Sequence, residues 1–120
     1  MTPRNLHEVL SRFDEPWSPR TVATVNDYDV RVFKAHGEFT PHCHDDTDEL
    51  FYVIEGRLTI RMESGDVELG PGDLFVVPRG VEHQPWSEHG ASALLLEPSA
   101  TVNTGDNPGE LTAPRVTLDD

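Results

Sequence analysis

The amino-acid sequence predicts a single all-β domain, built as a sandwich or a barrel of short strands. The chain has 120 residues, which is close to the commonest size of one domain. Ten prolines and nine glycines interrupt its apolar runs, which disfavours long helices. From residue 20 onward apolar and polar residues alternate with a period of two, and turn-forming residues recur about every 8–12 residues. Together these observations favour short strands joined by tight turns over a helical bundle.

Residues 1–19 differ from the rest of the chain, because their apolar residues follow the spacing of a helix. The pattern is formed by four side chains, those of Leu6, Val9, Leu10 and Phe13. The segment DEPWSP then ends it. We expect a short helix or an extended arm that packs on the main body and is anchored by Trp17.

Residues 20–98 form the predicted β-domain, with about eight or nine strands. Turns are expected at Asn26–Asp27 and at Ser64–Gly65, and the sequence GPGD gives a further reversal at residues 70–73. The segments expected to be strands read TVATV, YDVRVFKA, ELFYVIEG, RLTIRME, DVEL, LFVVP, RGVEHQPW and ASALLLEP.

Residues 99–120 change in character, because polar and turn-forming residues dominate them. We interpret this segment as a polar C-terminal tail. Part of it is expected to lie on the barrel as an edge strand, and its end is expected to be mobile.

The charge of the chain excludes two classes of partner. Acidic residues outnumber basic ones by 22 to 9, giving a formal net charge of −13. Such a surface repels nucleic acids and anionic membranes. The single cysteine, Cys43, cannot form an internal disulfide, and no stretch resembles a signal peptide or a membrane span. We therefore expect a soluble, cytoplasmic protein.

The stretch PHCHDDTDE, residues 41–49, is the first candidate for chemistry. Side chains alternate faces along a strand, so His42 and His44 point the same way and Cys43 points the opposite way. Glu49 opens the next predicted strand, on the same face as residues that should be buried, such as Phe51. A buried carboxylate is costly unless a metal ion, an arginine or a proton neutralises it.

A further candidate ligand, His83, lies downstream in the segment PRGVEHQPW. About 35 residues separate it from the first histidines, and neighbouring strands of a barrel can bring such segments together. Three imidazole nitrogens and one carboxylate oxygen suit Fe(II), Mn(II), Ni(II), Zn(II) or Cu(II). The residue types therefore predict a divalent transition metal ion without choosing which one.

At this point the sequence resembles the cupin family. The first cupin motif, a glycine followed by His-x-His, a glutamate and a second glycine, is matched by Gly37, His42, His44, Glu49 and Gly56. The second motif, with a glycine, Pro-x-Gly and a histidine, is matched by Gly72, Pro78, Gly80 and His83. Two departures are visible: the spacing from the first glycine to the first histidine is one residue short, and Ser87 stands where an asparagine is common. The resemblance covers roughly residues 30–97.

The resemblance implies a small antiparallel β-barrel of the jelly-roll type. It also implies a metal ion held inside by four side chains, those of His42, His44, Glu49 and His83. Proteins of this family are often homodimers, so a homodimer is expected here.

We interpret the chain as a metal-dependent enzyme that acts on a small polar molecule. Isomerase and dioxygenase chemistry are both compatible with the sequence, with Glu49 serving as a ligand or detaching to act as a base. A non-catalytic sensor or small-molecule-binding barrel is the alternative, and a purely structural metal site is a third. An empty, polar-lined cavity would favour the enzyme, whereas a cavity plugged by Phe and Trp would favour the structural site.

The remaining histidines, the cysteine, the acidic run and the aromatic residues are not expected to be catalytic. His7, His36 and His89 should be exposed, and Cys43 should be a buried packing thiol. The acidic run Asp45, Asp46 and Asp48 is expected to be solvated. Four aromatic residues are expected in the core or at its rim, with one or two of them at the pocket mouth: Phe39, Phe51, Phe75 and Trp86.

Overall fold

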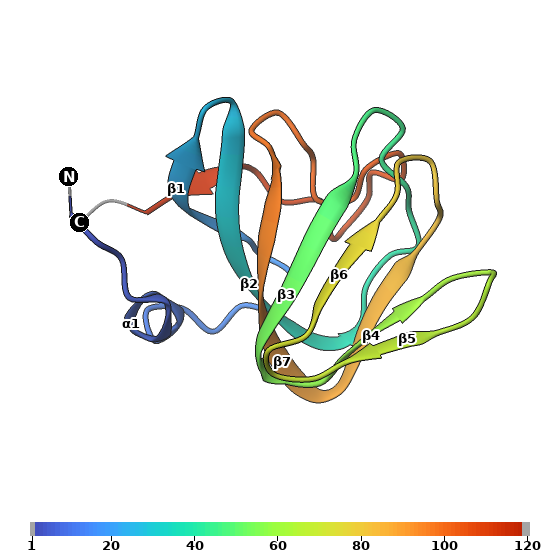
Figure 1. Ribbon diagram of the computed structural model, residues 1–120, viewed down its shortest axis with the longest axis horizontal. Helices are drawn as coiled ribbons and strands as arrows, with labels where there is room; N and C mark the ends of the chain where they lie inside the picture. Colours follow the sequence, from blue (N-terminus) through green and yellow to red (C-terminus); the bar gives the residue numbers. More distant parts are fainter. Residues whose placement is uncertain (1, 119–120) are drawn as a thin grey trace.

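The computed structural model describes residues 2–118, and its regular secondary structure is strands apart from one short helix (Figure 1). Its elements in chain order are α1 (Leu6–Leu10), β1 (Arg20–Val25), β2 (Tyr28–Glu38), β3 (Glu49–Gly56), β4 (Leu58–Arg61), β5 (Val67–Leu69), β6 (Leu74–Val77), β7 (Gln84–Pro98) and β8 (Val116–Thr117). No helix among these residues is long and apolar enough to cross a membrane. The expected mobility of the very end of the chain concerns residues 119–120, which lie outside the described part.

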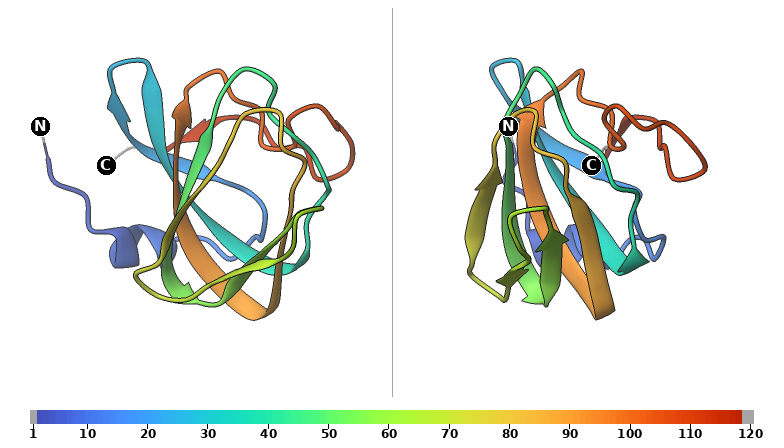
Figure 2. Two further views of the ribbon diagram at one scale, coloured as in Figure 1. Left: turned by 45° about the vertical axis from the view of Figure 1, so that its right-hand side comes forward. Right: turned by 90° about the vertical axis from the view of Figure 1, so that its right-hand side faces the viewer.

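Strand β7 is the centre of the sheet, and it is long enough to serve three neighbours. Its first half pairs with β4, its second half pairs with β3, and β2 runs antiparallel to it along the other edge. The strand order is β5-β4-β7-β2-β1-β8, with β6 attached to β3. The sheet therefore curls around a common interior, as the two views in Figure 2 show.

The sheet is open and mixed, and in these two respects it differs from the expected antiparallel jelly-roll barrel. β8 runs parallel to β1, with Arg20 opposite Val116. Within residues 2–118 no ladder joins β5 or β6 to β8. Between β2 and β3 the chain forms one isolated bridge, at His42, instead of a strand. Pro41 has no N–H to donate and the following acidic run favours turns, so a regular ladder does not form there.

Local turn chemistry was easier to predict than strand length. The hairpin at Asn26–Asp27 is confirmed, with Asn26 in the left-handed region at φ 56°. The hairpin between β4 and β5 is confirmed as well, but its loop spans residues 62–66 and its turn lies at Glu63–Ser64, one residue earlier than expected. Two segments expected to be separate strands, RGVEHQPW and ASALLLEP, instead contribute to the one continuous strand β7.

The core has two parts, on opposite faces of the sheet. Inside the curl lies a cluster rich in aromatic residues, which includes Phe33 and Phe51. On the outer face, α1 buries Val9 and Leu10 against Val32 of β2. Burying a side chain of this size stabilises a fold by about 1.5–3 kcal/mol. The N-terminal segment thus contributes to stability through the outer cluster.

Arg31 ties the C-terminal segment to the sheet. Its guanidinium donates to the carboxylates of Asp29 and Glu97 at 3.0–3.2 Å. It also donates to the carbonyl oxygens of Ser99 at 2.9 Å and Thr101 at 2.8 Å. A single buried cation therefore fixes the point where the chain leaves β7 and turns back across the sheet.

Candidate metal centre

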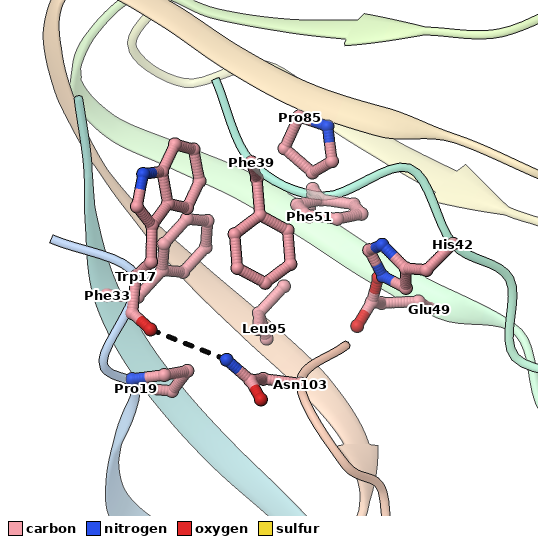
Figure 3. Close-up of a pocket in the computed structure, with 10 residues that line it drawn as sticks. All are labelled: Trp17, Pro19, Phe33, Phe39, His42, Glu49, Phe51, Pro85, Leu95 and Asn103. Carbon is pink, nitrogen blue, oxygen red and sulfur yellow. Dashed lines mark hydrogen bonds between the residues drawn. The ribbon is translucent and has the colours of Figure 1, made fainter. Parts of the chain in front are cut away.

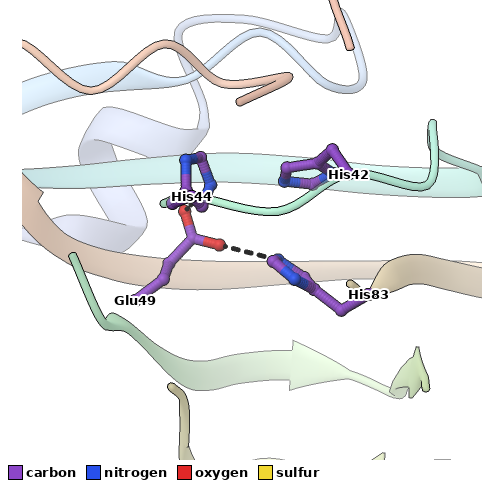
Figure 4. A group of neighbouring side chains, drawn as sticks. All are labelled: His42, His44, Glu49 and His83. Atoms are coloured by element: carbon purple, nitrogen blue, oxygen red, sulfur yellow. Dashed lines mark hydrogen bonds and ion pairs between the residues drawn. The ribbon is translucent and has the colours of Figure 1, made fainter. Parts of the chain in front are cut away.

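Three segments bring the candidate ligands together. His42 and His44 lie in the irregular segment after β2, Glu49 is the first residue of β3, and His83 immediately precedes β7 (Figure 4). His42 and His83 exchange backbone hydrogen bonds of 3.0 and 2.8 Å, which fixes one ligand segment against the other. The N–H of Gly80 donates to the carbonyl of His44 at 2.9 Å and joins the same two segments a second time.

The structure brings together all four side chains that the sequence singled out. Their candidate ligand atoms lie within 4.8 Å of one another. His83 Nε2 is 3.1 Å from Glu49 Oε1, and His44 Nε2 is 3.3 Å from Glu49 Oε2. Each of the four residues is at most 8% exposed. The cluster is therefore compact and shielded from solvent.

The arrangement of ring nitrogens tests whether these residues fit a metal ion. His42 Nδ1 lies 2.9 Å from the carbonyl oxygen of Thr40, and His83 Nδ1 lies 3.0 Å from that of Val81. A carbonyl can only accept, so each Nδ1 carries the proton and each Nε2 presents a lone pair. The lone pair of His83 then faces a carboxylate oxygen of Glu49. Two acceptors at this distance repel each other unless a cation lies between them.

Unpartnered nitrogens point to the same conclusion. His42 Nε2 and His44 Nε2 are buried and have no hydrogen-bond partner. Buried polar atoms are almost always satisfied, so these two require an explanation. A divalent ion accepting both lone pairs provides one, and the cluster therefore suits a metal ion.

The pKa values of His42 and Glu49 favour the protonation states that bind a cation. Burial, together with the neighbouring His83, lowers the pKa of His42 to about 4, so its ring is neutral at pH 7. Burial raises the pKa of Glu49, but the neighbouring His44 and His83 outweigh burial and hold that pKa well below its ordinary range. Neutral imidazoles and an ionised carboxylate are the forms that bind metals.

Glu97 is a residue of the site that sequence reasoning missed. It is fully buried on β7, beside Glu49, and accepts from Arg31 at 3.0 Å. Burial and the charge of Glu49 raise its pKa well above the ordinary range. The signal was present in the sequence, because Arg31 in YDVRVF and Glu97 in LLLEP are charged residues in strands otherwise dominated by apolar side chains.

A small pocket of about 30 Å³ adjoins the cluster (Figure 3). The rings of Trp17, Phe33, Phe39 and Phe51 line it, with His42 and Glu49 at one end. This volume holds about one or two water molecules. Of the four aromatic residues considered for the pocket mouth, Phe39 and Phe51 line this pocket, and Trp86 instead stacks on Arg61.

The other residues considered from sequence fall outside the cluster. His7, His36 and His89 are exposed, and so are Asp45, Asp46 and Asp48. The prediction of a buried packing thiol at Cys43 is wrong. Its side chain is half-buried and donates to Asp106 at 3.3 Å and Asp45 at 3.4 Å. These carboxylates, Asp106 first, raise the pKa of the Cys43 thiol to about 12, so it stays protonated.

The chain is similar in sequence to known proteins. The chain is 33% identical over 82 residues to the uncharacterized protein YdbB of Bacillus subtilis, covering 68% of this chain and 73% of that protein. It is 30% identical over 82 residues to 3-hydroxyanthranilate 3,4-dioxygenase of Ruegeria pomeroyi, spanning 64% of this chain but only 46% of that enzyme.

A solved structure matches the fold closely. The crystal structure of a cupin-2 domain protein from Shewanella frigidimarina superimposes with a TM-score of 0.78 at 40% identity, covering 79% of this chain and 93% of that one. The family described as "Cupin domain" (Cupin_2) matches residues 29–99, which contain both motifs and all four candidate ligands. The chain therefore belongs to the cupin family.

Proposed function

We propose that this cupin is a metal-dependent enzyme with dioxygenase-type activity on a small molecule. A divalent transition metal ion would be held by His42, His44, Glu49 and His83. The observation that carries the proposal is the set of buried, unpartnered imidazole nitrogens turned toward one ionised carboxylate. In a chain with a net charge of −13, such a cation would also make the site locally attractive to an anionic group.

Different residues of the chain have different roles at the site. When bound, the ion would supply a Lewis acid or, in the case of iron, a redox centre. The carbonyls of Thr40 and Val81 hold two of the imidazole rings in one orientation. Glu49 supplies negative charge and, if it detaches, a base. The aromatic wall keeps bulk water away from the reacting group.

Dioxygenase chemistry is preferred to isomerase chemistry because of the relatives. Two of the matching proteins are named as dioxygenases, the Ruegeria enzyme and a putative dioxygenase of Saccharolobus solfataricus at 26% identity. The chain covers only 46% and 17% of their lengths, so their substrates do not transfer directly. An isomerase has no comparable support. A cytoplasmic location is part of the proposal and is supported by the presence of a single cysteine.

A non-catalytic, metal-bearing binding protein is the second candidate. The lining of the pocket favours it, because apart from His42 and Glu49 none of the described residues that face the pocket has a titratable side chain to assist a reaction. The two candidates share the metal centre and differ in turnover. The experiment therefore has to test the metal first and the reaction second.

The first test is metal binding by purified protein made without a chelating tag. Elemental analysis should find about one divalent ion per chain, or the protein should take up zinc in competition with a chelating dye. His83→Ala should weaken zinc binding by about 100-fold or more, beyond the loss typical of a residue that only supports a ligand. The exposed His89→Ala is the matched control and should bind zinc normally. Protein that neither contains nor takes up metal would remove the basis of the proposal.

The second test is oxygen consumption by iron-loaded protein with a panel of small hydroxylated aromatic acids and diketones. The enzyme should consume oxygen with at least one compound, and His83→Ala should not. Thermal shifts with compounds that are never turned over, with iron or any other bound metal, would instead support the binding protein.

A further inference from the structure

Phe39 occupies the space between the candidate metal cluster and Trp17 at the other end of the pocket. Its ring centroid is 5.4 Å from that of His42 and 4.8 Å from that of Trp17. Figure 3 shows the ring between these two side chains. Any group that enters the pocket from the cluster therefore meets Phe39 before it can reach Trp17.

The backbone of Phe39 is fixed on both sides. Its N–H donates to the carbonyl of Pro85 at 2.9 Å, and its own carbonyl accepts from Gln84 Nε2 at 2.9 Å. The side chain is only 6% exposed and packs within the interior cluster. The ring is thus held in place by its surroundings. The pocket of about 30 Å³ beside it therefore limits the size of the group that can enter.

The other side of the cluster has a different character. A depression of about 350 Å³ reaches His44 and is lined by Asp45, Asp46 and Asp106. It is wide and acidic, whereas the pocket at Phe39 is narrow and apolar. A ligand bound at the cluster therefore has two different spaces available, and only the narrow one selects by size.

We infer that Phe39 is a specificity-determining residue of the proposed metal site. The substrate places oxygen donors at the cluster and a short apolar group, of about one or two carbons, in the pocket. A larger group, such as a phenyl ring, is excluded from the pocket by Phe39. This inference rests on the proposed function, because it requires a metal ion at the cluster.

Two hydroxamates test the inference, because they carry the same chelating head with a methyl or a phenyl group. Zinc-loaded protein labelled with ¹⁵N is titrated with acetohydroxamate and with benzohydroxamate. The chain has two tryptophans, and the indole N–H of Trp17 donates to the backbone carbonyl oxygen of His36 at 3.0 Å. Trp86→Phe assigns the two indole signals. The Trp17 signal reports on the pocket, and the Trp86 signal is an internal control outside it.

In the unaltered protein, acetohydroxamate should shift the Trp17 signal, and benzohydroxamate should leave it in place. Phe39→Ala should let benzohydroxamate shift the Trp17 signal and bind about tenfold tighter. Phe39→Leu is a smaller change that disturbs the fold less. It should change the Trp17 signal and the benzohydroxamate affinity in the same direction, but to a smaller extent. Phe13→Leu is the matched control, because Phe13 is equally buried but lies in the cluster on the outer face of the sheet.

Two kinds of result would overturn the inference, and they are distinguishable. If the protein binds no zinc, the proposed function fails and the inference fails with it. If zinc binds but benzohydroxamate shifts Trp17 in the unaltered protein, or if neither Phe39 variant changes its binding, the metal centre stands and the role of Phe39 is refuted.

Discussion

Glu97 is a buried carboxyl group with two charged neighbours. It lies between the guanidinium of Arg31 and the carboxylate of Glu49, and it is fully buried. A second carboxylate charge beside Glu49 would be repelled, so the protonated form is favoured even though Arg31 opposes it. We therefore interpret Glu97 as a neutral group that completes the surroundings of Glu49.

Glu97→Gln should consequently be nearly neutral, because glutamine resembles the protonated carboxyl in size and hydrogen bonding. We expect the free energy of unfolding to change by less than about 1 kcal/mol. Glu97→Ala should cost about 2–4 kcal/mol, because it leaves a cavity and removes an acceptor from Arg31. Urea denaturation of metal-free protein measures both. Equal losses in the two variants would mean that Glu97 is ionised in the folded state.

The C-terminal segment packs against the candidate metal centre. Asp106 accepts from the backbone N–H of Cys43 at 2.9 Å, and the N–H of Asp106 donates to the Cys43 carbonyl at 3.1 Å. Gly105 lies against the same peptide group, with a φ of 53° that favours glycine. The segment therefore packs directly on the residues that carry His42.

Gly105→Ala should disturb the candidate site without changing any candidate ligand. The new Cβ would collide with the carbonyl of Cys43 and would approach His42 Cδ2 to 3.0 Å. We expect zinc affinity to fall by about tenfold, as for loss of a supporting residue, with some loss of stability. Gly109→Ala is the control, because a Cβ there meets nothing within 4 Å. Equal zinc affinities in the two variants would show that the segment does not position His42.

Asp29 anchors the same segment and gives it a pH dependence. Arg115 donates to it at 2.8 and 3.0 Å, and this pairing, aided by Ser99 and Arg31, holds the pKa of Asp29 well below its ordinary value of 3.8 despite burial. A carboxyl with a lowered folded-state pKa adds stability above its unfolded pKa. That stability is lost as the pH falls through the folded-state pKa.

The stability gap between the unaltered protein and Asp29→Asn should therefore be largest above about pH 5, at roughly 3 kcal/mol. It should shrink progressively as the pH falls below 3.8. Urea denaturation across this range, on metal-free protein, measures the gap. Asp27→Asn changes an exposed carboxylate in the adjacent turn and should leave the gap small at every pH. A gap for Asp29→Asn that did not vary with pH would contradict the assignment.

Sequence reasoning found the ligands more readily than the shape that holds them. Motif spacing suffices to group His42, His44, Glu49 and His83, although His42 and His44 lie in an irregular segment and not on the strand expected there. Closure of the sheet depends on which edges meet, and this is decided by long-range packing that no local pattern encodes. The Arg31–Glu97 pair was missed for the same reason, because its partners are 66 residues apart in the chain. Cys43 was misjudged because its partner Asp106 comes from a segment expected to be a simple tail.

The outer face of β3 and β6 is unusually apolar for a chain with so many acidic residues. Leu74 is 58% exposed, Val76 41% and Tyr52 37%, and the adjoining Leu50 and Leu96 are only half-buried. These residues carry no charge, although the chain as a whole carries −13. Two copies repel each other through most of their surface, so a contact between them is favoured where both present neutral, apolar area.

We predict that this face forms a homodimer with a second copy of the chain. Sedimentation velocity should show a dimer at concentrations of about 10–100 μM, stronger at high salt because screening reduces the repulsion between acidic chains. Leu74→Glu places a charge on the most exposed residue named for this face and should give a monomer that keeps its fold and its zinc affinity. Val102→Glu is the control, since Val102 is 47% exposed but lies on the C-terminal segment. A monomeric unaltered protein at the highest concentration and salt would refute the dimer, and equal dissociation in both variants would place the interface elsewhere.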